Sequence, residues 1–287
     1  MKLVRFGEPG RERPGVWMND GRILDVRASA FHVKDYDAHF FERFGLAQLQ
    51  SLLADPGAKF VEAKNVRLGP PIAPPAKILC VGANYAAHAK EFGAEPPERP
   101  ILFAKATSAI VGPFDPILLP ADPEAVVDAE AELAVVIGRT TRAVPRERAL
   151  DAIAGYTVLN DVTDRTAQRT DGQWFRAKSA DAFSPLGPFL VTPDEAPDFG
   201  AMRVWQRLDG ETLQEASVPE TTFDVPTLIA YASERMTLHP GDVISTGTPP
   251  GIGSAHEPPR LLRPGCIVEV GVDGIGAQRS EVCAAKG

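Results

Sequence analysis

The stretch VDAEAELAVVIG, residues 127–138, indicates both the fold of this chain and the place of its chemistry. Its last part, residues 133–137, is apolar at every position, which is typical of a strand covered on both faces. Glu130 and Glu132 precede this apolar run, and Glu132 is directly adjacent to it. Because side chains alternate along a strand, the two carboxylates are expected to share one face, with their Cα atoms about 6.5 to 7 Å apart.

Two ionised carboxylates beside a buried strand need compensation, because burying them without a partner is too costly. A shared proton, an arginine, or a hard divalent cation that prefers oxygen ligands would each relieve the charge. Asp128 would extend the same row of acidic side chains. Alternatively, the row is a solvated face at the end of the strand. A third oxygen ligand from elsewhere in the chain would favour the metal.

A candidate third ligand is Asp161, which lies in GYTVLNDVTDRTAQ, residues 155–168. An apolar strand is expected to end at Asn160 and Asp161, and the next residues predict the start of a helix. On that helix Asp161, Arg165 and Gln168 stand at i, i+4 and i+7, so they share one face. Alternatively, Asp161 is the N-cap of the helix and Arg165 is its ion-pair partner.

Three other segments place polar side chains in apolar surroundings. In VGANYAAHAKEFG, residues 81–93, His88 and Glu91 stand three apart on a short helix, where a carboxylate can orient and charge an imidazole. WFRAKSADAFSPLGPFLVT, residues 174–192, brings Lys178 between aromatic residues. GDVISTGTPPGIG, residues 241–253, ends a strand in a Gly/Pro turn that exposes Thr246 and Thr248. Taken singly, such a pair or such a lysine is most often a surface feature.

The composition excludes several classes of function. With 30 Lys and Arg against 38 Asp and Glu, the formal net charge is −8, so most of the surface would repel the phosphate backbone of a nucleic acid. No apolar run approaches the roughly 20 residues that span a bilayer. The three cysteines are odd in number and lack metal or redox spacing, and no signal peptide is visible. We therefore expect a soluble cytoplasmic protein without a nucleic-acid or membrane partner.

The chain is expected to form two domains of the strand-rich α+β class. Residues 1–70 predict a small N-terminal α+β domain, with short strands followed by a helical stretch over residues 39–57. The segment RLGPPIAPPAK, residues 67–77, carries four prolines and is the expected linker. Residues 71–287 alternate apolar runs with Gly/Pro turns and are expected to form a larger α+β domain dominated by strands.

Taken together, these segments resemble the fumarylacetoacetate hydrolase family. The motifs occur in family order over about residues 77–285, as GANYAAHAKE, FAKATSAIVGPFDPI, DAEAELAVVIG, GYTVLNDVTDRTAQ, KSADAFSPLGPFLVT and GDVISTGTPPGIG. The beginning, MKLVRFGEPGRERPGVW, is similar to the subgroup with a small N-terminal domain, which includes acylpyruvate hydrolases and 2,4-diketo-3-deoxy-L-fuconate and rhamnonate hydrolases. The resemblance implies a mixed β-sandwich roll with flanking helices, generally as a homodimer.

The same resemblance implies a role for each candidate residue. It makes Glu130, Glu132 and Asp161 the ligands of a Mg²⁺ or Mn²⁺ ion, with Ca²⁺ as a further alternative. It makes His88 and Glu91 a pair that activates water, on a segment that closes over the substrate in relatives. The residues implied to line the substrate pocket are Arg165, Gln168, Lys178 and Thr248. The chain departs from bulkier residues common in relatives at Ala83, Ala180 and Ser184, which leaves the identity of the substrate open.

The expected activity is hydrolysis of the C3–C4 bond of a 2,4-dioxo acid, a small-molecule 2-oxo acid substrate, to pyruvate and a carboxylic acid. Lys178 would oppose the negative charge that develops on the enolate. An oxaloacetate-type decarboxylase or a dienoate isomerase is the first alternative, because both reactions use the same electron sink without water. A non-catalytic module that binds a metabolite is the second.

Overall fold

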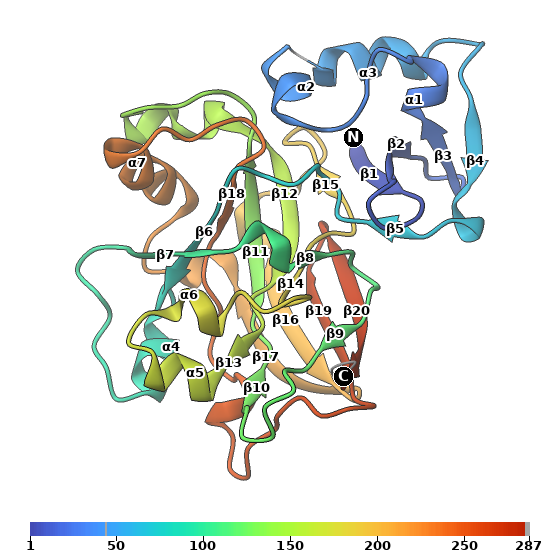
Figure 1. Ribbon diagram of the computed structural model, residues 1–287. Coiled ribbons are helices and arrows are strands. Elements are labelled where there is room, and N and C mark those ends of the chain that lie inside the picture. Colours follow the sequence, from blue (N-terminus) through green and yellow to red (C-terminus); the bar gives the residue numbers. More distant parts are fainter. Residues whose placement is uncertain (44, 285–287) are drawn as a thin grey trace.

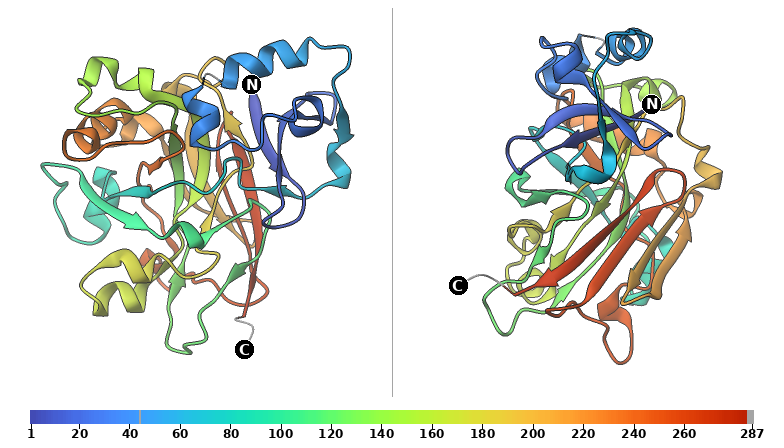
Figure 2. Two further views of the ribbon diagram at one scale, coloured as in Figure 1. Left: turned by 45° about the horizontal axis from the view of Figure 1, so that its top comes forward. Right: turned by 90° about the vertical axis from the view of Figure 1, so that its right-hand side faces the viewer.

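The computed structural model describes residues 1–43 and 45–284, and it is strand-rich α+β as expected. Two large sheets pack face to face, and the helices lie at the periphery of the molecule (Figure 1). Figure 2 shows the strands β19 and β20, drawn in red, slanting across one side of the molecule, with the N-terminal segment at the opposite end. No helix within the described residues is both long enough and apolar enough to cross a membrane.

The first large sheet contains the apolar run of residues 133–137. Its central strand β11 is buried at every position and pairs with β12 on one side and β18 on the other, which explains the unbroken apolar run. Both neighbours run antiparallel to it. The strands, in the order of the sheet, are β4 (Phe60–Glu62), β3 (Arg22–Asp25), β2 (Arg13–Trp17), β1 (Lys2–Phe6), β15 (Leu190–Val191), β12 (Ile153–Asn160), β11 (Ala131–Ile137), β18 (Val243–Ser245), β6 (Ile78–Gly82) and β7 (Ile101–Lys105), with β5 (Leu68–Gly69) paired to β1.

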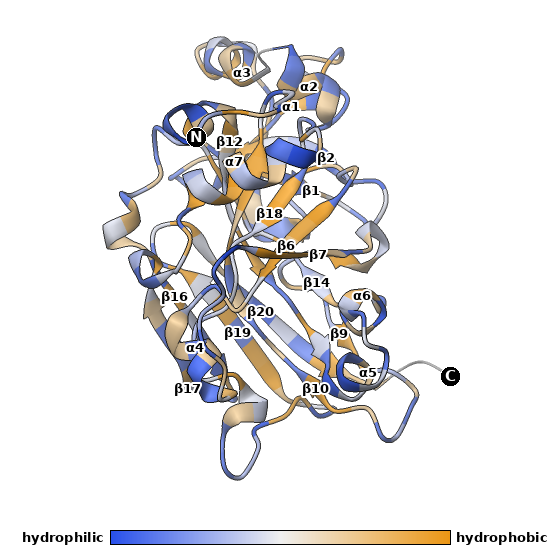
Figure 3. Cartoon of the chain, turned by 90° about the vertical axis from the view of Figure 1, so that its left-hand side faces the viewer, coloured by the Kyte–Doolittle hydropathy of each residue, from blue (hydrophilic) through white to orange (hydrophobic). Residues whose placement is uncertain are grey.

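The second large sheet covers the inner face of β11 and β12. Side chains from both sheets, such as Leu133, Val158, Val204 and Val270, form one buried core between them. Figure 3 shows the hydrophobic colour of β6 and β18 at the centre of the molecule. The strands of this sheet, in order, are β17 (Glu211–Ser217), β16 (Arg203–Leu208), β19 (Ile267–Val272), β20 (Gly276–Cys283) and β9 (Ile117–Leu118), and two small pairs are β10 (Val127–Asp128) with β13 (Thr163–Asp164) and β8 (Ile110–Val111) with β14 (Ser184–Pro185).

The N-terminal segment extends the first sheet. Strand β1 pairs with β15, with Lys2 opposite Val191 and Leu3 opposite Leu190. The helical stretch expected over residues 39–57 consists of two helices, and its Phe44 lies outside the described residues. Sequence reasoning therefore located three of the strands and the helical stretch of this segment but missed α1, β4 and β5, while the domain division at residue 70 stays a prediction. The helices of the segment are α1 (Val26–Ser29), α2 (Ala38–Glu42) and α3 (Gly45–Leu53).

Four helices lie between residues 71 and 284, and three of them contribute side chains to the candidate site. One expectation is wrong: the helix after β12 begins at Arg165, not at Asp161, because Asp164 is its N-cap and accepts hydrogen bonds from the N–H groups of Thr166 and Ala167. These helices are α4 (Ala86–Glu91), α5 (Arg165–Thr170), α6 (Trp174–Ala177) and α7 (Val225–Arg235). Short 3₁₀ turns are η1 (Ala63–Asn65), η2 (Thr107–Ala109), η3 (Arg146–Ala152), η4 (Phe199–Ala201), η5 (Val218–Glu220) and η6 (Gly253–Ala255).

Candidate active site

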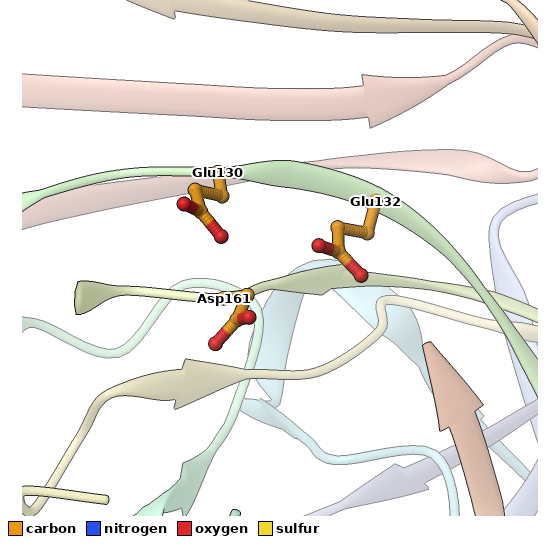
Figure 4. A group of neighbouring side chains, drawn as sticks. All are labelled: Glu130, Glu132 and Asp161. Atoms are coloured by element: carbon orange, nitrogen blue, oxygen red, sulfur yellow. The ribbon is translucent and has the colours of Figure 1, made fainter. Parts of the chain in front are cut away.

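Three carboxylates from two paired strands meet in the interior. Glu132 lies on β11, Glu130 lies just before that strand, and Asp161 directly follows β12. The β11–β12 register sets Ala131 opposite Asn160, and the N–H of Asp161 donates to the backbone oxygen of Glu130 at 2.9 Å. Figure 4 shows Glu130 and Glu132 projecting on the same side of the chain toward the segment that carries Asp161. The alternative of a solvated face is wrong, because all three side chains are buried.

The three carboxylates fit a hard divalent cation. One oxygen from each residue can be chosen so that the three lie within 4.8 Å of one another. An ion with bonds of about 2.0 to 2.6 Å, the range from Mg²⁺ to Ca²⁺, holds opposite oxygens about 4 to 5 Å apart. Carboxylate oxygens are also the donors that such ions prefer over softer ligands. The donor set and its spacing are therefore suitable for Mg²⁺, Mn²⁺ or Ca²⁺.

Buried cations surround the carboxylate cluster. The Nζ of Lys178 donates to Glu130 Oε2 at 2.8 Å and to Asp161 Oδ2 at 2.6 Å. The guanidinium of Arg165 donates to Glu130 Oε1 at 2.5 Å. The Nζ of Lys105 donates to the other oxygen of Asp161, also at 2.5 Å. Considered by itself in the sequence, Lys178 was expected to be a solvated lysine. It is instead only 2% exposed, and its charge is paired with the buried carboxylates of Glu130 and Asp161.

The surroundings of Glu130 and Glu132 shift the pKa values of these two carboxyls in opposite directions. Burial alone would raise the pKa of Glu130, but the charges of Lys178 and Arg165 outweigh it and hold that pKa well below its usual range. Burial, with the nearby charges of Asp161 and Glu130, raises the pKa of Glu132 well above its usual range. Burial and the neighbouring acids therefore oppose ionisation of Glu132, whereas the cations favour ionisation of Glu130.

The position of Glu132 is set by the end of β18 and the turn that follows it. The Ser245 hydroxyl and the N–H of Gly247 both donate to Glu132 Oε2, the second at 3.0 Å. Thr248, which the resemblance implies as a substrate contact, lines the same cavity. Its hydroxyl already donates to the backbone oxygen of Ala131 at 3.0 Å and accepts from Gln214 at 2.8 Å. The end of β18 and its Gly/Pro turn therefore fix the direction of the Glu132 carboxylate.

The predicted His–Glu pair forms on α4. His88 Nδ1 lies 3.0 Å from Glu91 Oε2. The other oxygen of Glu91 accepts the N–H of Gly251 at 2.7 Å, so both carboxylate oxygens have partners. The backbone oxygen of Gly251 lies 3.0 Å from His256 Nε2. Glu91 therefore ties α4 to the loop that follows β18, and His88 Nε2 has no hydrogen-bond partner among the described residues.

The candidate residues line one cavity of about 530 Å³. Glu91 is the exception, since it reaches the cavity only through its contact with His88. Asp128 also differs from the expected row: it is buried and does not line the cavity, and it accepts from Arg165 and from the N–H groups of Gly253 and Ser254. The site residues that contribute to the wall are Glu130, Glu132, Asp161, His88, Arg165, Gln168, Lys178 and Thr248.

Sequence reasoning missed Lys105 and Ser245. Lys105 is the one charged residue of the run PILFAK, at the end of an otherwise apolar strand, and this position could have identified it as a buried cation. Ser245 ends the apolar strand β18 in the same way. Lys105 donates to Asp161 and Ser245 donates to Glu132. In both cases a polar residue at the end of an apolar strand was the feature of the sequence that could have identified it.

Comparison with known proteins shows what the chain is similar to. The sequence pattern described as fumarylacetoacetate (FAA) hydrolase C-terminal matches residues 77–283. A protein of Burkholderia multivorans, whose name assigns it provisionally as a hydrolase, is 43% identical over 288 residues, which cover 100% of each chain. The likeness therefore extends over the N-terminal segment as well as the matched region.

Two solved structures share the fold over 100% of each chain. One is the maleylpyruvate hydrolase of Sphingobium sp. SYK-6 in complex with a manganese(II) ion and pyruvate, at 30% identity and a TM-score of 0.82. The other is the 2-hydroxyhepta-2,4-diene-1,7-dioate isomerase of Mycobacterium marinum, at 31% identity and a TM-score of 0.76. The strand-rich fold implied by the sequence resemblance is confirmed by these comparisons.

Proposed function

Because the chain belongs to the fumarylacetoacetate hydrolase family, we propose that it hydrolyses the C3–C4 bond of a 2,4-dioxo acid to pyruvate and a carboxylic acid. The observation that carries the proposal is the meeting of three buried carboxylates and a His–Glu pair at one cavity. The similar maleylpyruvate hydrolase, an enzyme that acts on an acylpyruvate, supports it, since its structure holds Mn²⁺ and pyruvate.

In this proposal Glu130, Glu132 and Asp161 hold a Mg²⁺ or Mn²⁺ ion, with Ca²⁺ as the alternative. The bound ion supplies Lewis acidity and a template for the carboxylate and 2-keto oxygens of the substrate. Arg165 stays paired to Glu130 and donates to Gln168 Oε1 at 3.0 Å, so these two side chains form one polar wall for the substrate. Thr248 contributes to the same wall.

The His88–Glu91 pair acts as the general base. Glu91 accepts from His88 Nδ1, which orients the ring and raises the basicity of Nε2. Nε2 takes a proton from water, and the hydroxide adds to the C4 carbonyl of the substrate. General acid–base action of this kind is worth about 10² to 10⁴ in rate.

Lys178 stabilises the negative charge that follows. Collapse of the C4 adduct breaks the C3–C4 bond, releases the carboxylic acid and leaves the electron pair on C3, delocalised as the enolate of pyruvate. The Lys178 ammonium is fully buried between Glu130 and Asp161, so it opposes this charge in a medium of low dielectric constant. Protonation of C3 then yields pyruvate.

A spectrophotometric screen tests the proposal. Acylpyruvates and 2,4-diketo-3-deoxy sugar acids are incubated with the protein and Mn²⁺, and loss of the enol absorbance is followed. We expect at least one substrate to give pyruvate and a carboxylic acid in equal amounts. Heat of binding in calorimetry without turnover across the panel would instead favour a non-catalytic module.

An isomerase is the second candidate function. The specific observation in its favour is the 31% identity to a dienoate isomerase of the same fold. In an isomerase, an enolate formed at the same site would be reprotonated at a different carbon. In a decarboxylase, the enolate would form by loss of CO₂ from oxaloacetate. Neither reaction uses water. Product analysis separates the three: an isomer of unchanged mass means isomerisation, CO₂ means decarboxylation, and two fragments that include pyruvate mean hydrolysis.

We also propose that the protein works as a homodimer on a small 2-oxo acid, as the family resemblance implies. Light scattering on the Mn²⁺-loaded protein measures the mass directly. A single-chain mass at concentrations where the enzyme is fully active would contradict the dimer.

A further inference from the structure

Two of the proposed ion ligands depend on the backbone of the one residue between them. Ala131 separates Glu130 from Glu132, is fully buried, and is the first residue of β11. The two glutamate side chains project on the same side of the chain (Figure 4). Because side-chain direction follows the backbone in an extended segment, the peptide groups on either side of Ala131 set how the two carboxylates face each other.

The strand ladder holds Ala131 on one side only. On the β12 side it is paired with Asn160. On the other side, the ladder between β11 and β18 covers Ala134, Val135 and Val136 and does not extend to Ala131. A buried N–H or C=O without a partner is costly, so the backbone of Ala131 needs partners from outside the ladder.

Gln214 supplies one of these partners and orients the other. Its Oε1 accepts the N–H of Ala131 at 3.1 Å, and its Nε2 donates to the Thr248 hydroxyl at 2.8 Å. That hydroxyl in turn donates to the backbone oxygen of Ala131 at 3.0 Å. Nε2 also donates to the backbone oxygen of Pro249 at 2.7 Å. One amide side chain thus joins the N–H and the C=O of Ala131 in a closed set of hydrogen bonds.

The partners of Gln214 require a primary amide. The N–H of Ala131 can only donate and the backbone oxygen of Pro249 can only accept, so the side chain between them has to offer an acceptor and a donor together. An ionised glutamate would lack the donor, and a lysine would lack the acceptor. Gln214 is fully buried, so an uncharged amide also avoids the cost of burying an ion.

Gln214 reaches the proposed ion site from the opposite sheet. It lies on β17, the edge strand of the second large sheet, and is 83 positions from Ala131 in the chain. Gln278, a second buried glutamine of that sheet, donates instead to three backbone oxygens, none of which belongs to a proposed ligand. The contact to the segment Glu130–Glu132 is therefore a feature of Gln214 and is not shared by both glutamines.

We propose that Gln214 is a positioning residue for the divalent ion, because it holds the peptide groups on both sides of Ala131 and so fixes the separation of the Glu130 and Glu132 carboxylates. This inference rests on the ion site of the proposed function and does not depend on which reaction follows. Gln214 does not line the cavity, so it acts through the ligands. Residues that orient metal ligands in this way typically contribute about 10- to 100-fold to metal affinity.

Calorimetric titration with Mn²⁺ tests the inference without any substrate. Gln214→Met keeps a side chain of similar length and removes both hydrogen-bonding groups, and we expect it to lower Mn²⁺ affinity by about 10- to 100-fold. Gln278→Met is the matched control, which should lose stability but keep the native Mn²⁺ affinity. Urea unfolding of the metal-free proteins shows that each variant is folded during the titration.

The electron paramagnetic resonance spectrum of bound Mn²⁺ separates positioning from a loss of stability, because that spectrum depends on how the ligands surround the ion. At saturating Mn²⁺ we expect an altered spectrum for Gln214→Met and the native spectrum for Gln278→Met. Thr248→Val tests the same set of hydrogen bonds if Gln214→Met does not fold, since it removes the hydroxyl that joins Gln214 to Ala131. It should weaken Mn²⁺ binding, whereas Thr248→Ser keeps the hydroxyl and should restore it.

The outcomes distinguish failure of this inference from failure of the proposed function. Native Mn²⁺ affinity and a native spectrum in Gln214→Met would overturn the positioning role, and so would an equal loss of affinity in Gln278→Met. No Mn²⁺ binding by the native protein would overturn the ion site and this inference together. Weakened binding in Gln214→Met with native binding in Gln278→Met, but no hydrolysis of any 2,4-dioxo acid, would support the positioning role and overturn the hydrolase.

Discussion

The strand-borne carboxylates and the helix-borne residues of the cavity are held in different ways. Glu132 and Asp161 lie at paired strands in the core, where the backbone register sets their separation. The helices α4, α5 and α6 have four to six residues each, and α4 is joined to the loop after β18 by the single hydrogen bond from Gly251 to Glu91. The difference teaches that the proposed ion site is part of the folded core, whereas the proposed base and substrate contacts depend on a few hydrogen bonds between short elements.

Removing a strand-borne ligand is expected to have the largest effect. Glu132→Ala should abolish Mn²⁺ binding and reduce kcat/KM by more than about 10⁴, because the ion and its Lewis acidity are lost together. Calorimetric titration with Mn²⁺ measures the first effect. Asp128→Asn is the control, since that carboxylate contacts Arg165 and the N–H groups of Gly253 and Ser254, and it should retain the ion. Full Mn²⁺ affinity in Glu132→Ala would remove Glu132 from the ion site.

Removing the helix-borne base is expected to come second. His88→Ala should lower kcat by about 10² to 10⁴ while Mn²⁺ binding and the free energy of unfolding stay close to native values. His32→Ala, at an exposed histidine of the N-terminal segment, is the matched control and should leave kcat unchanged. Native turnover of an acylpyruvate by His88→Ala would show that this imidazole is not the base.

The tether between the two regions can be broken at Gly251. Its φ is +92°, and a Cβ there would lie 2.1 Å from the backbone oxygen of Leu213, so Gly251→Ala must displace the loop that holds Glu91. We expect it to cost about 2 to 4 kcal/mol of unfolding free energy and to lower kcat. Gly265→Ala, at φ +89° with no atom within 4 Å, isolates the backbone strain and should cost about 1 to 2 kcal/mol.

Denaturant unfolding of both glycine variants measures these costs. We expect Gly251→Ala to be more destabilised than Gly265→Ala, and only Gly251→Ala to have a reduced kcat. Equal losses in the two variants would mean that the collision with Leu213 does not occur and that the loop is not a tether.

The pH dependence of ion binding is expected to be the smallest effect. The pKa of Glu132 is raised by burial and by the charges of Asp161 and Glu130, so below that pKa an ion must displace a proton. Mn²⁺ affinity should fall as the pH falls, by up to about tenfold per pH unit. Titrations in buffers of different ionisation enthalpy count the released proton, and affinity that is constant with pH would contradict the raised pKa.

In the metal-free protein, Glu132 should lower the free energy of unfolding as the pH rises, whereas Mn²⁺ affinity increases with pH. A carboxyl whose folded-state pKa is raised stabilises the fold most at pH values below its unfolded pKa, and that contribution is lost as the pH rises through the folded-state pKa. Glu132→Gln keeps the shape of the side chain without the charge. Its metal-free form should therefore gain unfolding free energy over the native chain as the pH rises, which urea denaturation at several pH values measures.

Local sequence patterns predicted more of the strands than of the connections. The apolar run before Gly138 identified β11, and GYTVLN identified most of β12, because both signals depend only on neighbouring residues. The start of α5 was misplaced by four residues, since Asp161 and Asp164 are both acceptable caps in sequence. In the structure the chain stays extended through β13 up to Asp164, whose side chain caps the helix.

The sequence by itself determined which chemical groups the site contains. They are two alternating glutamates, an aspartate after an apolar strand, and a histidine three residues from a glutamate. The fold decided which of these acids face one another and which cations they meet. Asp128 and Glu130 stand two apart, yet Asp128 satisfies the backbone of Gly253 and Ser254 while Glu130 faces the cavity. Lys105 reaches Asp161 across 56 positions of the chain. Such partners are brought together by strand pairing and burial, which act between distant segments and leave no periodic trace in the local sequence.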